Sequence, residues 1–126
     1  MDTNAVIGLL AGKASLHKRI RRRAPKDFGI SAITTHELYF GAFKSQRTTH
    51  NLDRIEALQF EVVGFDQEDS RQAGAIRAML AAIGTPIGPY DVLTAGQARA
   101  RDLTLITRNT GEFSRVEGLR VEDWES

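Results

Sequence analysis

The chain has 126 residues, 41% of them hydrophobic, which is enough for one domain with a real core and leaves no room for a second. It has no cysteine, which excludes a disulfide framework, thiol catalysis and zinc held by thiolates, and makes a reducing cytoplasm the expected location. The net charge of +1 points to no partner by itself, and neither a signal peptide nor an apolar run of membrane-spanning length is expected.

Segments with helical and strand-like patterns alternate along the chain. Helices are predicted at residues 5–23 with a break near Gly12, at 35–43, 49–58, 66–83 and 89–101, and as a short turn or helix at 110–113. Strands are predicted at residues 27–31, 60–63, 103–107 and 119–121. Because strands interleaved with helices need crossover connections, the pattern predicts one three-layer α/β/α domain over residues 1–126 with a mostly parallel central sheet.

The start of the chain departs from this pattern. In such a fold an apolar strand normally leads into the first helix, but only Met1 precedes Asp2. Two alternatives stay open: the start is truncated or misassigned, or the sheet is built without this strand.

Four side chains that can ligate a metal stand at junctions between a predicted strand and a predicted helix: Asp2, Glu37, Asp91 and Asn109. In an open α/β sheet such junctions meet at the edge where ligands bind. Carboxylates brought together there repel one another unless a hard cation lies among them. Oxygen ligands favour magnesium or manganese over zinc or copper, so the four residues predict a site for Mg²⁺ or Mn²⁺.

Each of the four residues also has a purely structural interpretation at a helix start. Glu37 closes a capping box with Thr34 beside the staple residue Ile33, Asp91 follows Pro89 at the first helical position, Asn109 is a good N-cap, and Asp2 can open the first helix. Taken one at a time, the four residues do not distinguish a cap from a ligand.

Five segments, taken together and in order, resemble a known family. They are residues 2–4, 31–38 with Gly41 beyond, 87–91, 105–113 and the closing segment 116–124. The first four resemble PIN-domain nucleases, and the last resembles the tail of the VapC toxins of bacterial VapBC toxin–antitoxin modules. The resemblance covers nearly the whole chain.

The resemblance implies an endoribonuclease that depends on Mg²⁺ or Mn²⁺ and cleaves structured RNA, often transfer RNA. It also implies a VapB-type antitoxin that holds the enzyme inactive, and a homodimer. Asp2, Glu37 and Asp91 match the three acidic ligands of the family. Asn109 falls where the family has Asp or, fairly often, Asn.

Three further residues are accessory candidates near the fourth ligand. Thr107 matches a hydroxyl position of the family, and Glu112 can partly replace the charge that Asn109 does not carry. Arg108 is the nearest cationic side chain by sequence for stabilising a phosphate in the transition state.

The chemistry expected of this site uses water as the nucleophile, activated by the metal. Either Asp91 or Glu37 can take the proton, and the sequence does not choose between them. The alternative function is a PIN-like module without cleavage activity that binds RNA or an antitoxin.

Charged and aromatic surface candidates complete the predictions. The basic run at residues 18–23 is a solvated helix face, a track for an RNA backbone or an antitoxin contact. The second half is rich in arginines that suit an RNA groove: Arg71, Arg77, Arg99, Arg101, Arg108 and Arg115. Tyr39, Phe40 and Phe43 are expected in the core or at a subunit interface, and Trp124 is expected to pack.

Overall fold

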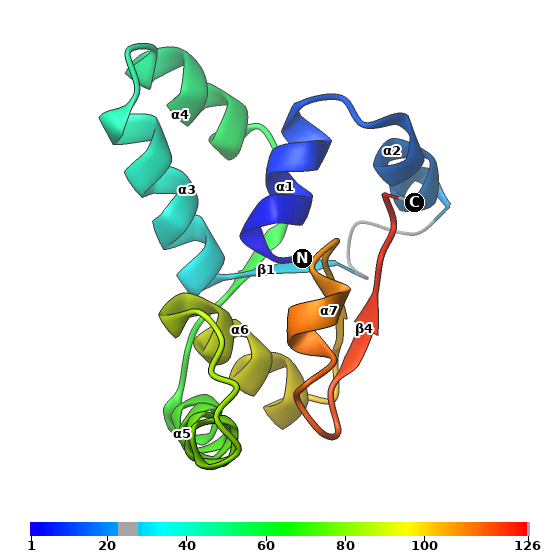
Figure 1. Ribbon diagram of the computed structural model, residues 1–126. Coiled ribbons are helices and arrows are strands. Elements are labelled where there is room, and N and C mark those ends of the chain that lie inside the picture. Colours follow the sequence, from blue (N-terminus) through cyan, green and yellow to red (C-terminus); the bar gives the residue numbers. More distant parts are fainter. Residues whose placement is uncertain (23–27, 126) are drawn as a thin grey trace.

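A computed structural model describes residues 1–22 and 28–125, with the side chains of residues 3 and 4 excepted (Figure 1). Helices and strands alternate over these residues as the sequence predicts. In chain order they are α1 (Thr3–Leu10), α2 (Ala14–Arg21), β1 (Gly29–Ser31), α3 (Ala32–Lys44), α4 (Thr48–Glu56), β2 (Glu61–Val63), α5 (Gln67–Ala82), α6 (Pro89–Ala100), β3 (Thr104–Ile106), α7 (Thr110–Phe113) and β4 (Arg120–Glu122).

Two glycines that were predicted to interrupt or end a helix do so in the structure. Gly12 separates α1 from α2 with a φ of +82°, and Gly84 follows α5 with a φ of +73°. Both are left-handed conformations that glycine adopts without a steric penalty. Arg23 of the basic run and Asp27 of the first predicted strand lie outside the described residues.

The strands pair in parallel, as predicted. β1 pairs with β2 in a register that places Ile30 opposite Val62, and β3 pairs with β4 with Leu105 opposite Val121. In the described part of the chain these form two separate two-stranded sheets instead of one central sheet. The mostly parallel α/β architecture is therefore correct, but the sheet is divided.

Residues 1 and 2 lie between the two sheets. The Met1 nitrogen donates to the Gly29 carbonyl of β1 at 3.2 Å, and the Asp2 amide donates to the Ile106 carbonyl of β3 at 3.0 Å. Figure 1 shows the N-terminus beside β1, at the point where α1 begins. Asp2 is therefore fixed where the ends of both sheets meet.

Two apolar clusters support this arrangement. One gathers α1, α2 and β1 around Phe28 and Trp124, whose rings meet edge to face at 5.8 Å, so the predicted packing role of Trp124 is confirmed. The other lies between α5, α6 and β3. There α5 and α6 approach so closely that a Cβ on Gly96 would lie 2.6 Å from the backbone of Ala73.

The aromatic side chains of α3 do not join either cluster. Phe40 and Phe43 are 62% and 67% exposed, and Tyr39 is 36% exposed. The core role expected for them is wrong, because they lie outside both apolar clusters and stay exposed. A subunit-interface role stays a prediction.

Candidate active site at the helix starts

Asp2 is a buried carboxylate held on both sides. It caps α1 by accepting a hydrogen bond from the Ala5 amide at 2.9 Å, which confirms its predicted structural role. Its other oxygen accepts a hydrogen bond from the buried Thr107 hydroxyl at 2.5 Å. Burial raises the pKa of Asp2, and the bonds from Thr107 and Ala5 oppose that rise. The hydroxyl of Thr107, which was predicted to lie beside Asn109, thus orients Asp2.

Glu37 does not cap a helix. α3 begins at Ala32, three residues earlier than predicted, because β1 leads directly into it and the Ser31 hydroxyl accepts the hydrogen bond from the Ile33 amide at 3.1 Å. Thr34 is fully buried inside the helix, and its hydroxyl has no hydrogen-bond partner among the described residues. The predicted capping box with its staple is therefore wrong, and Glu37 stands in the second turn of α3, half-buried.

Asp91 lies in the first turn of α6, where it was predicted. Gly88 is the N-cap residue and Pro89 takes the first helical position. The pKa of Asp91 is raised to about 6 by burial and by the negative charges of Glu112, Glu37 and Asp2, and a hydrogen bond with Glu112 adds to the rise. Asp91 therefore lies within electrostatic reach of the two other predicted acids and of Glu112.

Glu112 connects the starts of α6 and α7. One of its oxygens accepts a hydrogen bond from the Gly88 amide at 2.9 Å, and the other accepts from the Asn109 side-chain amide at 2.5 Å. The bond from Gly88 and the bond from Asn109 keep the pKa of Glu112 below its ordinary value, although burial opposes them. Glu112 is thus charged beside Asp91, which explains part of the raised pKa of Asp91.

Asn109 occupies the N-cap position of α7, but its side chain makes no capping hydrogen bond within the described structure. The predicted N-cap position is confirmed, while the capping hydrogen bond is absent, and the side-chain NH2 donates to Glu112. Its own backbone amide donates to the Thr107 hydroxyl at 3.0 Å. Through Thr107 the fourth predicted ligand is connected to Asp2, the first.

The matching family model covers residues 1–119 and is described as the PIN domain. The chain belongs to the PIN domain family. It is 43% identical to the tRNA(fMet)-specific endonuclease VapC of Shigella flexneri over 127 residues, covering 98% of this chain and 96% of the relative. With the protein of the same name from Salmonella typhimurium it shares 40% identity, with the same coverage of both chains.

Solved structures agree with this placement among the VapC members of the PIN domain family. A DNA-bound VapBC from Salmonella typhimurium matches with a TM-score of 0.91 at 39% identity, covering 98% of this chain and 95% of that one. VapBC-1 of nontypeable Haemophilus influenzae matches with a TM-score of 0.91 at 32% identity, covering 99% and 96%. The predicted family is confirmed.

The residues of this PIN domain fit a hard divalent cation by their chemistry. The donors that gather at the helix starts are carboxylate and amide oxygens, and burial together with their mutual repulsion raises the pKa of Asp91 to about 6. Across residues 1–22 and 28–125, no three acidic or histidine side chains stand close enough together to form a finished metal site. The oxygen ligands that such a cation prefers are therefore present among the described residues, but three acidic side chains do not form a preassembled group there.

Arg108 contributes the positive charge of the site. It is exposed, and its charge acts to lower the pKa of Asp2. Its predicted role in stabilising a phosphate stays a prediction.

Arg99 and Arg101, two of the six arginines from which an RNA groove was expected to draw some members, are engaged within the domain. Arg101 donates to both carboxylate oxygens of Asp69, at 3.2 and 3.0 Å, and to the Gly64 carbonyl at 3.0 Å. Arg99 donates to the Gln72 side-chain oxygen at 2.8 Å. Pairing with α5 is the physical reason that these two guanidinium groups are not available for phosphates.

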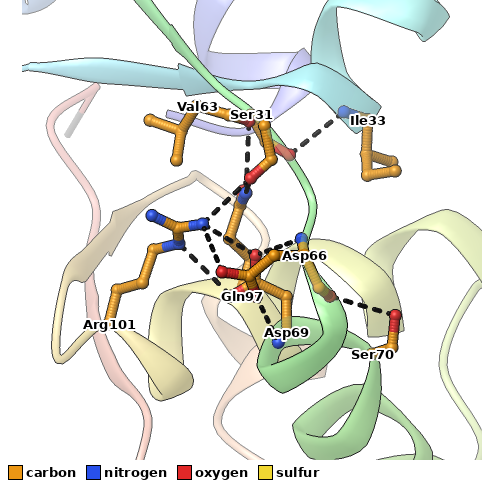
Figure 2. A network of polar contacts seen from close by, with 9 residues as sticks. Ser31, Ile33, Val63, Asp66, Asp69, Ser70, Gln97 and Arg101 are labelled. Carbon is orange, nitrogen blue, oxygen red and sulfur yellow. Dashed lines mark hydrogen bonds and ion pairs between the residues drawn. The ribbon is translucent and has the colours of Figure 1, made fainter.

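The network around Asp69 was not anticipated from the sequence, although it positions α6. Figure 2 shows Asp66, Asp69, Gln97 and Arg101 converging below the end of β2. Gln97 donates to the Val63 and Gly64 carbonyls at 3.2 and 3.0 Å, while Asp66 and Asp69 form a capping box at the start of α5. The spacing of Asp66 and Asp69 could have revealed the capping box, but no local pattern reveals the partners Arg101 and Gln97.

Proposed function

We propose that the chain is the toxin of a type II toxin–antitoxin pair and acts as a metal-dependent endoribonuclease on structured RNA. The relatives named tRNA(fMet)-specific endonuclease support the reaction and make transfer RNA the substrate to test first. The observation that carries the proposal is that the negative charges of Glu112, Glu37 and Asp2 raise the pKa of Asp91, because a domain built only to bind has no use for carboxylates that repel one another.

Asp2, Glu37, Asp91 and Asn109 would hold Mg²⁺ or Mn²⁺, with Glu112 as an additional acidic neighbour. Such an ion polarises a phosphate ester and lowers the pKa of a coordinated water. It would also relieve the repulsion that raises the pKa of Asp91. Thr107 keeps Asp2 oriented through the 2.5 Å hydrogen bond, so that this ligand does not need to be reorganised.

Asp91 is the better candidate for the base. Its pKa of about 6 belongs to the domain without a cation, where the carboxylate is mostly ionised at neutral pH. With a cation bound, the carboxylate would stay ionised to lower pH and would accept the proton of the attacking water. The water oxygen forms a bond to phosphorus, a P–O bond of the RNA breaks, and the leaving oxygen takes up a proton. The guanidinium of Arg108 would stabilise the charge that develops on the phosphate.

The partner would be a VapB-type antitoxin, since the solved structures that match with TM-scores of 0.91 are VapBC assemblies. A homodimer remains a prediction, for which the exposed Phe40 and Phe43 of α3 offer a surface. In the described residues, none of the helices has the length and apolar character needed to cross a membrane.

The test is RNA cleavage by antitoxin-free protein. Protein stripped with a chelator is incubated with total transfer RNA, with and without Mg²⁺ or Mn²⁺, and compared with Asp91→Asn and Glu37→Gln. Glu68→Gln is the matched control, because Glu68 is an exposed acid on α5, away from the helix starts that carry the site. Discrete fragments should require metal and should decrease by about 10²-fold or more in the first two variants only.

A thermal-shift measurement separates the two functional hypotheses. Millimolar Mg²⁺ should raise the melting temperature of the unmodified chain and of Glu68→Gln, because ligand binding stabilises the folded state. Asp91→Asn should lose most of this rise. RNA that stays intact but is retained by folded protein with every metal would assign the chain the alternative binding role.

A further inference from the structure

Two aromatic rings meet at the surface between α3 and α6. The rings of His36 and Tyr90 lie with their centroids 5.2 Å apart, at an angle of 59°. Both residues are exposed, and Tyr90 keeps 46% of its surface accessible. Among the described residues, neither ring contributes to the two apolar clusters that form the core. The pair is therefore a surface contact whose rings stay accessible to a planar group from solution.

The ring pair adjoins the candidate active site on both helices. His36 directly precedes Glu37 on α3, and Tyr90 directly precedes Asp91 in the first turn of α6. Because successive residues of a helix point about 100° apart, each ring projects beside its neighbouring acid. The charge of Glu37 contributes to the raised pKa of Asp91, so the two acids lie within electrostatic reach of each other. A base bound to the rings would thus lie next to a phosphate held at the acids.

The charge around the acids does not by itself favour a nucleic acid. RNA is a polyanion, and the carboxylates of Asp2, Glu37 and Asp91 repel its phosphates. Arg101 is engaged by both carboxylate oxygens of Asp69. Contacts that do not depend on charge would offset the repulsion. Stacking of a base on an aromatic ring is such a contact, and each stacked base strengthens binding by about 5- to 150-fold.

The composition of the pair favours a nucleotide over a protein surface. A groove of about 630 Å³ further along α3 is lined by His36 together with Tyr39, Phe40 and Phe43. Its phenylalanines suit an apolar protein surface. The imidazole of His36 and the phenol of Tyr90, by contrast, combine a flat ring with groups that can form hydrogen bonds to a base edge or a ribose hydroxyl. Sequence-specific recognition of RNA mostly uses unpaired bases that are splayed out and stacked on such rings.

We propose that His36 and Tyr90 form a stacking site for an unpaired base of the RNA, next to the phosphate that is cleaved. The site selects single-stranded loops over paired stems, because a base inside a duplex is already stacked and does not reach the rings. The proposal rests on the proposed nuclease function for the position of the cleaved phosphate. Binding and cleavage are therefore tested separately.

The binding experiment uses Asp91→Asn protein, in which RNA should stay intact, with two fluorescent probes: an RNA hairpin with an unpaired loop and a fully paired RNA duplex. In this background, Tyr90→Leu and His36→Leu should each weaken hairpin binding by about 5- to 150-fold and duplex binding by less than about twofold. Tyr90→Phe keeps the ring and should bind the hairpin within about threefold of the tyrosine form. Phe43→Leu, which removes an exposed ring about two turns further along α3, should leave both affinities unchanged.

Two further measurements accompany the binding experiment. The melting temperature of Tyr90→Leu should stay within about 4 °C of that of Tyr90→Phe, because the ring is exposed. With Asp91 restored and metal present, Tyr90→Leu should lower kcat/KM for total transfer RNA by the same factor as it lowers hairpin binding.

Four outcomes discriminate between the interpretations. Absent hairpin binding, or equal hairpin affinities of Tyr90→Leu and Tyr90→Phe, would overturn the stacking site even if the chain cleaves RNA. A loss of affinity that is equal for hairpin and duplex would assign the rings a structural role instead. A change in sedimentation coefficient that accompanies the loss would assign them to a contact between two copies of the chain. Ring-dependent hairpin binding by a chain that cleaves no RNA with any metal would support the stacking site and overturn the nuclease function alone.

Discussion

Two aspartates in this domain meet opposite electrostatic surroundings. Asp69, at the start of α5, is 1% exposed; burial acts to raise its pKa, but the hydrogen bonds and charge of Arg101, together with the Asp66 amide, hold that pKa below its ordinary value. Asp91, at the start of α6, is partly buried and surrounded by Glu112, Glu37 and Asp2, and its pKa rises to about 6. The difference is that Asp69 is paired with a cation of the fold, Arg101, whereas Asp91 is surrounded by other acids, which is the electrostatic basis of the metal site proposed above.

The same contrast predicts opposite dependences of stability on pH. The contribution of Asp69 is present above the ordinary carboxyl pKa of 3.8 and is lost as the pH falls through the lowered folded-state pKa. Asp91 binds its proton more tightly in the folded state, so it favours folding below pH 3.8 and opposes folding once the pH exceeds about 6.

The largest effect on stability is expected from Asp69→Asn. Removing the charge leaves Arg101 facing a neutral amide, so the free energy of unfolding at pH 7 should fall by about 2–3 kcal/mol in urea titrations. RNA cleavage per folded molecule should stay within about twofold. An unchanged unfolding midpoint would show that the pairing does not support the fold and would remove the contrast with Asp91.

A smaller effect of opposite sign is expected from Asp91→Asn without added metal. A shift from 3.8 to about 6 corresponds to at most about 3 kcal/mol, and solvent screening of this half-buried side chain reduces the expected gain to about 1 kcal/mol at pH 8. The gain should vanish at pH 3.5, where both forms are neutral. A lower free energy of unfolding for Asp91→Asn at pH 8 would mean that groups of the folded domain already stabilise the charged Asp91 carboxylate.

The smallest effect is expected from Glu112→Gln. Loss of its charge should lower the pKa of Asp91, because Glu112 is the first of the charges that raise it. The pH at which cleavage reaches half of its maximal rate, or the carboxyl ¹³C titration of Asp91, should shift to lower pH. The side-chain amide oxygen of the variant can still accept the hydrogen bond from the Gly88 amide, but the bond from the Asn109 side chain is lost, so the free energy of unfolding should fall by at most about 1 kcal/mol. A shift to higher pH would contradict the assigned role of Glu112.

Local patterns predicted helix starts well where the cap is a neighbour in sequence. Pro89 at the first helical position and Asp2 as a cap agree with the structure because both depend on the backbone within one turn. The capping box at Thr34 failed because β1 runs directly into α3, which moved the start of that helix to Ala32. Asn109 stands at the predicted N-cap position, but its side chain makes no capping bond within the described structure, and its NH2 donates to Glu112.

The sequence by itself determined the alternation of helices and strands, the family and the positions of Asp2 and Asp91 at helix starts, since these depend on periodicity and on residue types at short spacing. Only the tertiary structure decided which acids meet an opposite charge. Asp69 and Arg101 are 32 residues apart and Asp2 and Thr107 are 105 apart. Partners at such separations come together through the packing of α5 on α6 and of residues 1–2 between the sheets. That packing sets whether a carboxylate lies beside an opposite charge, as Asp69 does, or beside other acids, as Asp91 does.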